Sequence, residues 1–188
     1  VGKPQVTDVI AIEGDGNDAE AVFHIWDSAS TGVAMLPPPV PAAHFTDRGD
    51  MWGFSSARYR SAFHWSEYSV CVFDADTQVG VYWVDRASHL PYWARSSPMR
   101  SLFHWLMERH GRQLLHAAAI GTEAGAALIV GKGGVGKSTT SLSSISQGMR
   151  FAGDDYVVVG FDPEPVVWSL YCTAKVSPRQ LAAFPMLE

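Results

Sequence analysis

The 188-residue sequence has little cysteine and no long apolar run, and each deficit excludes a class of protein. Two cysteines, Cys71 and Cys172, are too few for a disulfide framework and lack the spacing of a metal site. Because such a chain does not depend on an oxidising compartment, we expect a cytoplasmic protein. No apolar stretch approaches the length of a membrane span and no signal-peptide pattern is found, which predicts that no membrane is involved.

Basic residues are also scarce. Lysine and arginine number 14 against 19 aspartates and glutamates, a formal net charge of −5. Because no basic stripe is available to neutralise phosphates, we expect no nucleic-acid partner. A hydrophobic content of 47% still indicates a globular chain, long enough for one large domain or two small ones.

Residues 1–95 are expected to form a β-rich N-terminal region. Short stretches rich in β-branched and aromatic residues predict strands, separated by turn-forming residues, at 6–12, 21–26, 70–73 and 79–84. Asp74-Ala75-Asp76-Thr77 predicts a hairpin turn between the last two. The proline-rich segment 37–41 predicts a stiff extended link.

Residues 96–188 are expected to form a second, α/β domain with a mixed sheet. Apolar residues at helical spacing predict a helix over 98–110, with Ser97 as its N-cap and Gly111 at its end. Strands are predicted at 114–120, 126–130, 156–159 and 166–170, and a short helix near Ser177-Pro178. The chain begins without a methionine and ends soon after this helix-like segment, so we expect the domain to be incomplete at its C-terminus.

Gly131 to Ser138 reads Gly-Lys-Gly-Gly-Val-Gly-Lys-Ser, a complete phosphate-binding loop of the form GxxxxGK[ST]. Glycines let backbone N–H groups surround phosphate oxygens, Lys137 reaches the β- and γ-phosphates, and the Ser138 hydroxyl ligates Mg²⁺. The loop lies between a predicted strand and a segment able to open a helix, whose N-terminus favours anions. The predicted nucleotide-binding residues are Gly131, Lys132, Gly133, Gly134, Val135, Gly136, Lys137, Ser138 and Thr139.

Two further features lie near this loop in the sequence. Asp154-Asp155 follows Lys137 by 17 residues, and adjacent carboxylates beside a nucleotide can divide metal binding and proton acceptance between them. The same Gly153-Asp154-Asp155 is also ordinary turn chemistry. His116 precedes Gly131 by 15 residues, and a histidine in an apolar strand is usually a structural residue.

Together, His116, the loop and Asp154-Asp155 resemble the catalytic domain of HPr kinase/phosphorylase, a family related to ATP-dependent phosphoenolpyruvate carboxykinase. The resemblance covers roughly residues 112–160, and the stretch from Leu90 to His116 resembles a diverged subgroup that accompanies peptide-modifying machinery, including that for lasso peptides. It implies a homo-oligomer, and phosphoryl transfer from ATP with Mg²⁺ to a serine hydroxyl.

The resemblance also implies the site residues. Asp154 would be the general base, Asp155 would bind metal with Ser138, and His116 would tune the acidic pair. Lys137, with Mg²⁺, would neutralise the charge that develops during phosphoryl transfer. The sequence departs from the family at Thr139, where HPr kinases carry an acidic residue, and residues 1–90 do not contain a recognisable regulatory domain. The predicted acceptor is therefore a serine of another protein or of a ribosomal peptide.

Two alternatives stay open. Residues 132–140 also resemble the loop of ParA/MinD-type ATPases, in which a lysine at the position of Lys132 reaches the partner's nucleotide. Asp162, 25 residues after Lys137, matches the acidic strand end of that family. The other alternative is a nucleotide-binding module without catalysis.

Overall fold

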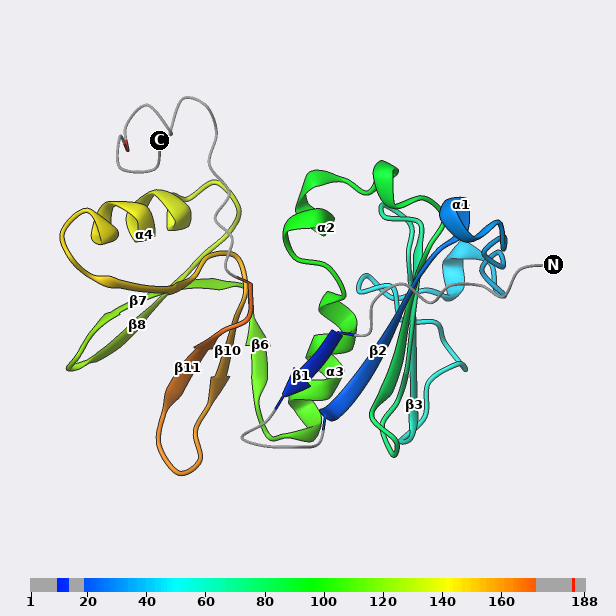
Figure 1. The fold of residues 1–188 in the computed structure, drawn as a ribbon, viewed down its shortest axis with the longest axis horizontal. Helices are drawn as coiled ribbons and strands as arrows, with labels where there is room; N and C mark the ends of the chain where they lie inside the picture. Colours follow the sequence, from blue (N-terminus) through cyan, green and yellow to red (C-terminus); the bar gives the residue numbers. More distant parts are fainter. Residues whose placement is uncertain (1–9, 14–18, 172–183, 185–188) are drawn as a thin grey trace. The chain divides into compact units, whose positions relative to one another are not determined.

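The computed structural model describes residues 10–13, 19–171 and 184, and the chain divides into two compact units, residues 1–109 and 110–188 (Figure 1). The fold is mixed α/β, rich in β-sheet and with few helices, as expected in outline. The strand predicted at 6–12 is described only from Ile10, and the helix predicted near Ser177 lies outside the described residues.

The first unit is built on a five-stranded sheet with strand order β1-β2-β5-β4-β3. Neighbouring strands are antiparallel except for the parallel pair β2 and β5. The strands are β1 Ile10–Glu13, β2 Ala19–Asp27, β3 Tyr59–His64, β4 Ser69–Asp74 and β5 Val79–Val84. The helical segments are α1 Ser28–Thr31, the 3₁₀ turns Ala42–His44 and Ala87–His89, α2 Tyr92–Ser96 and α3 Arg100–Arg109.

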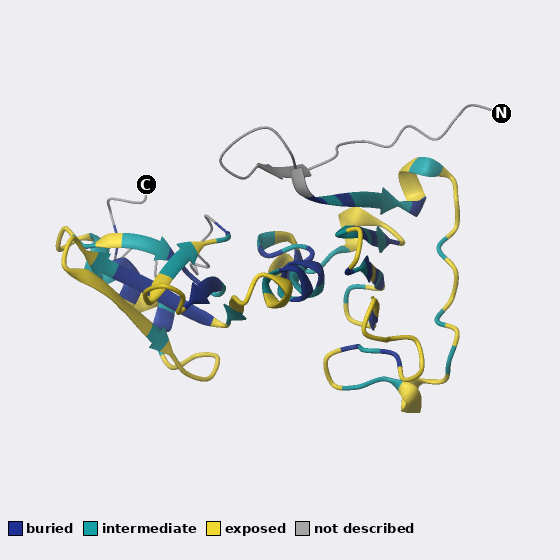
Figure 2. Ribbon diagram, turned by 90° about the horizontal axis from the view of Figure 1, so that it is seen from below, coloured by how far each residue is buried: buried dark blue, intermediate teal, exposed yellow. Residues whose placement is uncertain are grey.

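Helix α3 packs on β4 and β5 with the apolar face that its sequence period predicts. Leu102, Phe103 and Leu106 are buried, and the Phe103 ring meets Phe23 edge to face with centroids 5.3 Å apart. Figure 2 shows buried residues gathered on this helix and on the inner strands. Because its apolar face is buried here, the helix belongs to the first unit, and the boundary lies after Arg109 rather than at 95/96 as predicted.

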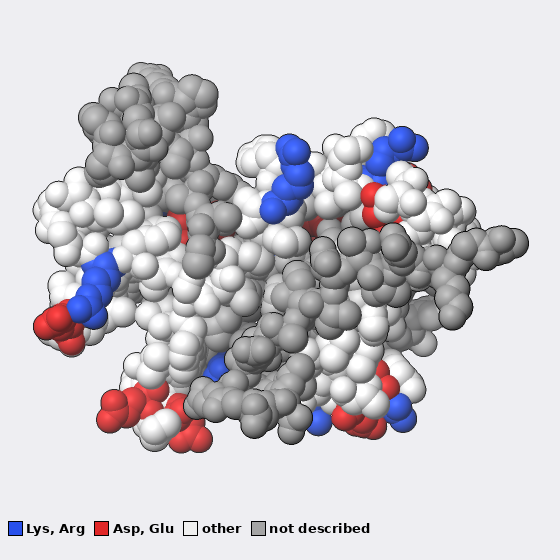
Figure 3. Space-filling view, viewed as in Figure 1, with Lys and Arg blue, Asp and Glu red and all other residues white. Residues whose placement is uncertain are grey.

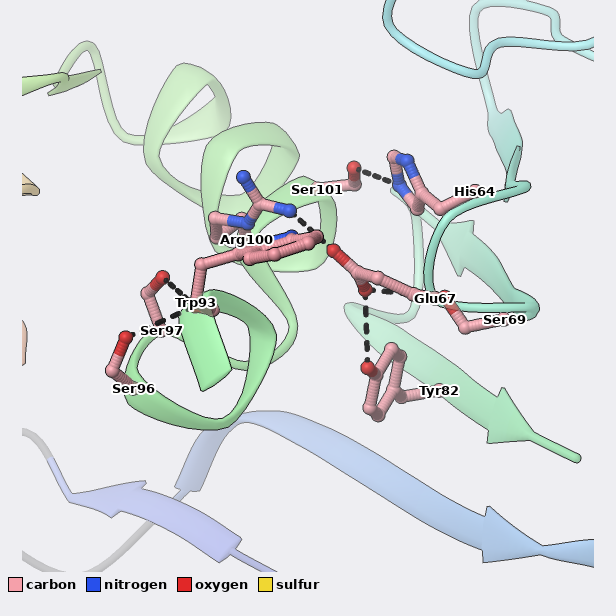
Figure 4. Close-up of polar contacts among 9 residues, drawn as sticks. All are labelled: His64, Glu67, Ser69, Tyr82, Trp93, Ser96, Ser97, Arg100 and Ser101. Carbon is pink, nitrogen blue, oxygen red and sulfur yellow. Dashed lines mark hydrogen bonds and ion pairs between the residues drawn. The ribbon is translucent and has the colours of Figure 1, made fainter. Parts of the chain in front are cut away.

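A polar cluster is buried where α3 begins (Figure 4). Glu67, between β3 and β4, forms an ion pair with Arg100 and accepts hydrogen bonds from Ser69 Oγ and Tyr82 Oη, both at 3.3 Å. His64 Nε2 lies 2.8 Å from Ser101 Oγ. Every polar group named here has a partner, and the cluster holds the first turn of α3 against the sheet.

The N-terminus of α3 differs from the prediction. The helix begins at Arg100, not Pro98, because Met99 adopts a φ of +56°, outside the helical region. The predicted cap is also wrong, since Ser97 Oγ donates to the Trp93 carbonyl at 2.8 Å and ends α2 instead.

The second unit contains two three-stranded sheets, β8-β7-β9 and β11-β10-β6, and one helix among its described residues. Its elements are β6 Gln113–Leu115, β7 Ala117–Thr122, β8 Gly125–Val130, α4 Lys137–Ile145, β9 Arg150–Gly153, β10 Val157–Gly160 and β11 Val166–Ser169. All strand pairs in both sheets are antiparallel, so the only parallel pair described lies in the first unit, not in the predicted mixed sheet.

Strand β7 is covered on both faces, which explains its unbroken apolar sequence. Ala117 and Ala119 pack with Val157 of the second sheet, and α4 packs on the β8-β7-β9 sheet (Figure 1). The strand predicted at 114–120 is divided at His116 into β6 and β7, which belong to different sheets.

None of the helices in the described ranges has the length and apolar content that crossing a bilayer requires. On the face shown in Figure 3, lysine and arginine side chains lie apart from one another, interspersed with acidic ones.

Candidate functional site

The pairing of β7 with its two neighbours brings the predicted site residues to one sheet edge. β8 and β9 both run antiparallel to β7, so their carboxyl ends lie at the same edge, beside the amino end of β7. Val130, the last residue of β8, pairs with Ala117, and Gly153, the last residue of β9, pairs with Ala119. The loop that begins at Gly131, the acidic pair that begins at Asp154, and His116 therefore start from adjacent positions.

The loop from Gly131 to Gly136 joins β8 directly to α4, as the sequence predicts. Gly131 has a φ of +153°, a conformation that L side chains rarely adopt, and a Cβ there would also lie 2.8 Å from Val135 Cγ2. Gly136, at a φ of +98°, is the N-cap of α4, a conformation that L side chains rarely adopt. The loop thus requires glycine at both of its ends.

Lys137 is the first residue of α4 and is only 8% exposed. Its Nζ donates to the carbonyl oxygens of Gly131 at 2.8 Å and Lys132 at 3.3 Å. The ammonium group therefore lies against the start of the loop. The exposed residues of the loop and of the first turn of α4 are Gly131, Lys132, Gly133, Gly134, Val135, Thr139 and Thr140, while Ser138 is half-buried.

Asp154 is fully buried, with an exposed fraction of 0%. Both of its carboxylate oxygens are buried, and neither has a hydrogen-bond partner among the described residues. A buried carboxylate without partners is costly, and native proteins contain few of them. The unsatisfied oxygens of Asp154 thus mark this edge as a place where a group from outside the chain could bind.

Asp155 has a different environment from its neighbour. Its Oδ1 lies 3.5 Å from His116 Nε2, and its φ is +70°, which is rare for a residue other than glycine. Tyr156 N donates to the Asp154 carbonyl at 2.9 Å, so Asp155 is the centre of a three-residue turn with positive φ, a strained type of γ-turn.

His116 and the acidic pair meet because both lie where a chain segment passes from one sheet to the other. β9 pairs with β7 up to Gly153 and Ala119, and pairing resumes in the other sheet between Val157 and Leu115. The same register carried across the break places Tyr156 opposite His116. The two rings are indeed stacked, 5.1 Å between centroids at an interplanar angle of 20°.

The structure thus brings His116, Asp154, Asp155 and the loop to one edge, but not Asp162. Asp162 lies between β10 and β11, at the far end of β10 from the acidic pair. Within residues 10–13, 19–171 and 184, no three His, Cys, Asp or Glu side chains form a group that could hold a metal by themselves.

Two aromatic residues at this edge were not predicted from the sequence. Tyr156 stacks on His116, and Tyr171 meets Tyr156 edge to face, with centroids 6.3 Å apart at 76°. The position of Tyr156 directly after the acidic pair could have marked it as a candidate site residue. The sequence does not show, however, that the strand register places its ring opposite His116.

Comparison with known proteins adds no family to this geometry. No protein-family model matches the chain, and no curated protein matches it. Any function must therefore follow from the chemistry of the loop, the buried carboxylate and the His116–Asp155 pair.

Proposed function

We propose that this chain is an ATP-dependent kinase of the HPr kinase type that phosphorylates a serine of a protein or ribosomal peptide. One observation carries the proposal. Asp154, whose buried carboxylate has no partner among the described residues, follows a strand that ends at the same sheet edge as the strand before the phosphate-binding loop. A loop alone indicates phosphate binding, whereas a carboxylate beside it supplies a reaction.

Asp154 is the general base in this proposal. In phosphoryl transfer the attacking hydroxyl loses a proton, and a positioned carboxylate can accept it. An oxygen already bound to the protein would have to give up that partner first. The oxygens of Asp154 have no such partner among the described residues, so no internal hydrogen bond has to be broken before one of them accepts the proton.

The loop and α4 are the binding site for the nucleotide phosphates. Backbone N–H groups of the loop and the N-terminus of α4 attract anions, and Lys137 adds a full positive charge. Among the described residues Lys137 Nζ donates only to carbonyl oxygens, and these are weaker partners than a phosphate. The ammonium group can therefore exchange these hydrogen bonds for ones to a bound phosphate.

Ser138 and Asp155 are the residues that would hold Mg²⁺. Mg²⁺ usually takes one or two carboxylates together with substrate phosphates and water, so a dedicated cage of three protein ligands is not required. When bound, the ion neutralises charge on the phosphates. His116, 3.5 Å from Asp155, fixes the orientation of that carboxylate.

Incubation with ATP, Mg²⁺ and serine-containing peptides tests the proposal, with mass spectrometry to locate an added phosphate. Lys137→Ala should abolish nucleotide binding, measured by calorimetry, whereas Asp154→Asn should bind ATP and fail to transfer phosphate. Transfer by Asp154→Asn at the wild-type rate would exclude Asp154 as the base.

Lys132→Ala separates this proposal from a ParA/MinD-type ATPase. Lys132 is exposed, and only its carbonyl takes part in the hydrogen bonds described for the loop, so its loss should weaken a kinase only slightly. Loss of ATP hydrolysis in that variant, without any peptide phosphorylation by the wild type, would favour the ATPase. ATP binding without either reaction would favour a binding module.

A further inference from the structure

We infer that Tyr156 is a positioning residue, whose ring holds the imidazole of His116 against Asp155 and thereby maintains the turn that separates the two carboxylates. The inference concerns the arrangement of the protein itself. Only its consequence for catalysis rests on the proposed kinase function.

His116 needs a support because it is not enclosed. Its side chain is 51% exposed, whereas the side chain of its partner Asp155 is 18% exposed. A half-exposed imidazole has several rotamers available, and a single polar contact of 3.5 Å is a weak restraint. The Tyr156 ring lies parallel to the imidazole, 5.1 Å away, and covers one of its faces.

Tyr156 is itself fixed from a third segment. Tyr171, two residues after the end of β11 and 8% exposed, places its ring edge to face with Tyr156. Such T-shaped contacts are favourable aromatic arrangements. The His116, Tyr156 and Tyr171 rings therefore contact one another in sequence, from an exposed site residue to a buried residue.

The turn at Asp155 explains why such a support is needed. A φ of +70° in a non-glycine residue costs free energy and persists only when the surrounding structure enforces it. Restraint comes from both sides: Tyr156 N donates to the Asp154 carbonyl, and His116 contacts the Asp155 carboxylate. The first restraint uses only the backbone N–H of residue 156, whereas the second depends on the Tyr156 ring, which holds His116 in place.

The turn has a chemical consequence. It directs two consecutive carboxylates to different environments, Asp154 into the interior without partners and Asp155 toward His116. The contact with His116 holds Asp155 in the second of these environments, and the Tyr156 ring holds His116. Tyr156 is thus expected to keep the base and the metal-binding carboxylate distinct.

Nuclear magnetic resonance of the nucleotide-free chain tests the geometry without reference to activity. The ring protons of His116, assigned with a His116→Gln variant, should show ring-current shifts and nuclear Overhauser contacts to Tyr156 in the unmodified protein. In Tyr156→Leu the shifts should move to those of a free histidine, whereas Tyr156→Phe should retain them. Tyr92→Leu, a change of an exposed tyrosine in the other unit, is the matched control and should alter nothing at His116.

Phosphate transfer by the same variants tests the consequence. Tyr156→Leu should lower kcat by about 10-fold, as the loss of a residue that orients a site group does, with little change in KM for ATP. Tyr156→Phe, which keeps the aromatic ring, should retain the wild-type kcat.

The outcomes separate the two ideas. Absence of contacts between His116 and Tyr156 in the unmodified protein, or unchanged His116 shifts in a folded Tyr156→Leu, would overturn the positioning role. Displaced shifts with unchanged kcat would overturn its catalytic part. If the wild type transfers no phosphate, the kinase proposal fails, and the resonance data still decide whether Tyr156 holds His116.

Discussion

Each unit contains a buried carboxylate, and the two differ in whether they have hydrogen-bond partners. Glu67 in the first unit is 5% exposed and has an arginine, a serine hydroxyl and a tyrosine hydroxyl as partners (Figure 4). Asp154 in the second unit is 0% exposed and has no partner among the described residues. The same chemical group is thus fully satisfied in one place and left unsatisfied in the other.

The difference indicates what each group does. Glu67 joins the β3–β4 turn to the first turn of α3, so its partners are the elements that it connects, and its role is structural. The carboxylate of Asp154 has no hydrogen-bond partner in the described chain, and yet its burial is costly. A cost that brings no internal contact is typical of a functional residue, because function and stability often compete.

Asp154→Asn is the sharpest test of this contrast. We expect phosphate transfer to fall by about 10²–10⁴-fold, the contribution of a general base. The thermal unfolding midpoint should stay the same or rise, because a carboxylate without partners is removed. A large loss of stability in calorimetry would place Asp154 with Glu67 as a structural residue.

Glu67→Ala should have the opposite effect. Removing one partner of a buried ion pair leaves the other uncompensated, and we expect a loss of about 3 kcal/mol in unfolding free energy, at the low end because Arg100 is 30% exposed. Six of the seven tryptophans lie in residues 1–109, so tryptophan fluorescence during urea unfolding reports on this unit. Nucleotide binding, measured in the same samples without urea, should be unchanged.

Asp155→Gly should lower phosphate transfer and raise the stability of the second unit. Glycine adopts a φ of +70° without strain, so the unfolding free energy should rise by about 1 kcal/mol. Phosphate transfer should fall, because the carboxylate proposed to bind Mg²⁺ is lost. Asp155→Asn is the control, since it keeps the side-chain shape and most of the backbone strain. An equal change in stability for both variants would contradict strain at this turn.

The smallest effect is expected from pH in the first unit. Burial lowers the pKa of His64 below its usual value, an effect that Arg100 increases and that Glu67 and Asp50 oppose. In the unfolded chain His64 therefore binds a proton at a higher pH than in the folded chain. The free energy of unfolding is unaffected by His64 above about pH 6.5 and falls as the pH drops below that value. Urea midpoints measured by tryptophan fluorescence should show this fall, and His64→Gln should reduce it.

The local parts of the fold could be predicted from the sequence. The strand, loop and helix around Gly131–Lys137 follow from glycine chemistry and an apolar run, both of which act over a few residues. The face of α3 follows from its period in the same way. Strands β3 and β9 were not predicted, because Tyr59–His64 and Arg150–Gly153 have mixed composition and are strands through their partners.

The candidate site was predictable in its members but not in its arrangement. His116, Asp154 and Asp155 were selected by residue type and spacing, but that His116 contacts Asp155 and not Asp154 depends on strand register. The division of this apolar run at His116 was not predicted for the same reason. Residues 114–120 have the composition of a single strand, and only their pairing with two different sheets divides them into β6 and β7. Tyr171 enters only through the fold.

The hairpin of β7 and β8 gives the spacing between His116 and Gly131 a specific meaning. The chain leaves the site along β7, turns after Thr122 and returns along β8, so that Val130 again lies beside Ala117. Lengthening both strands equally would move the far turn outward and leave every residue at the site edge in place. Two chains could therefore share this site while differing in that distance, so homologues are better recognised by which residues pair at the edge than by a fixed count between motifs.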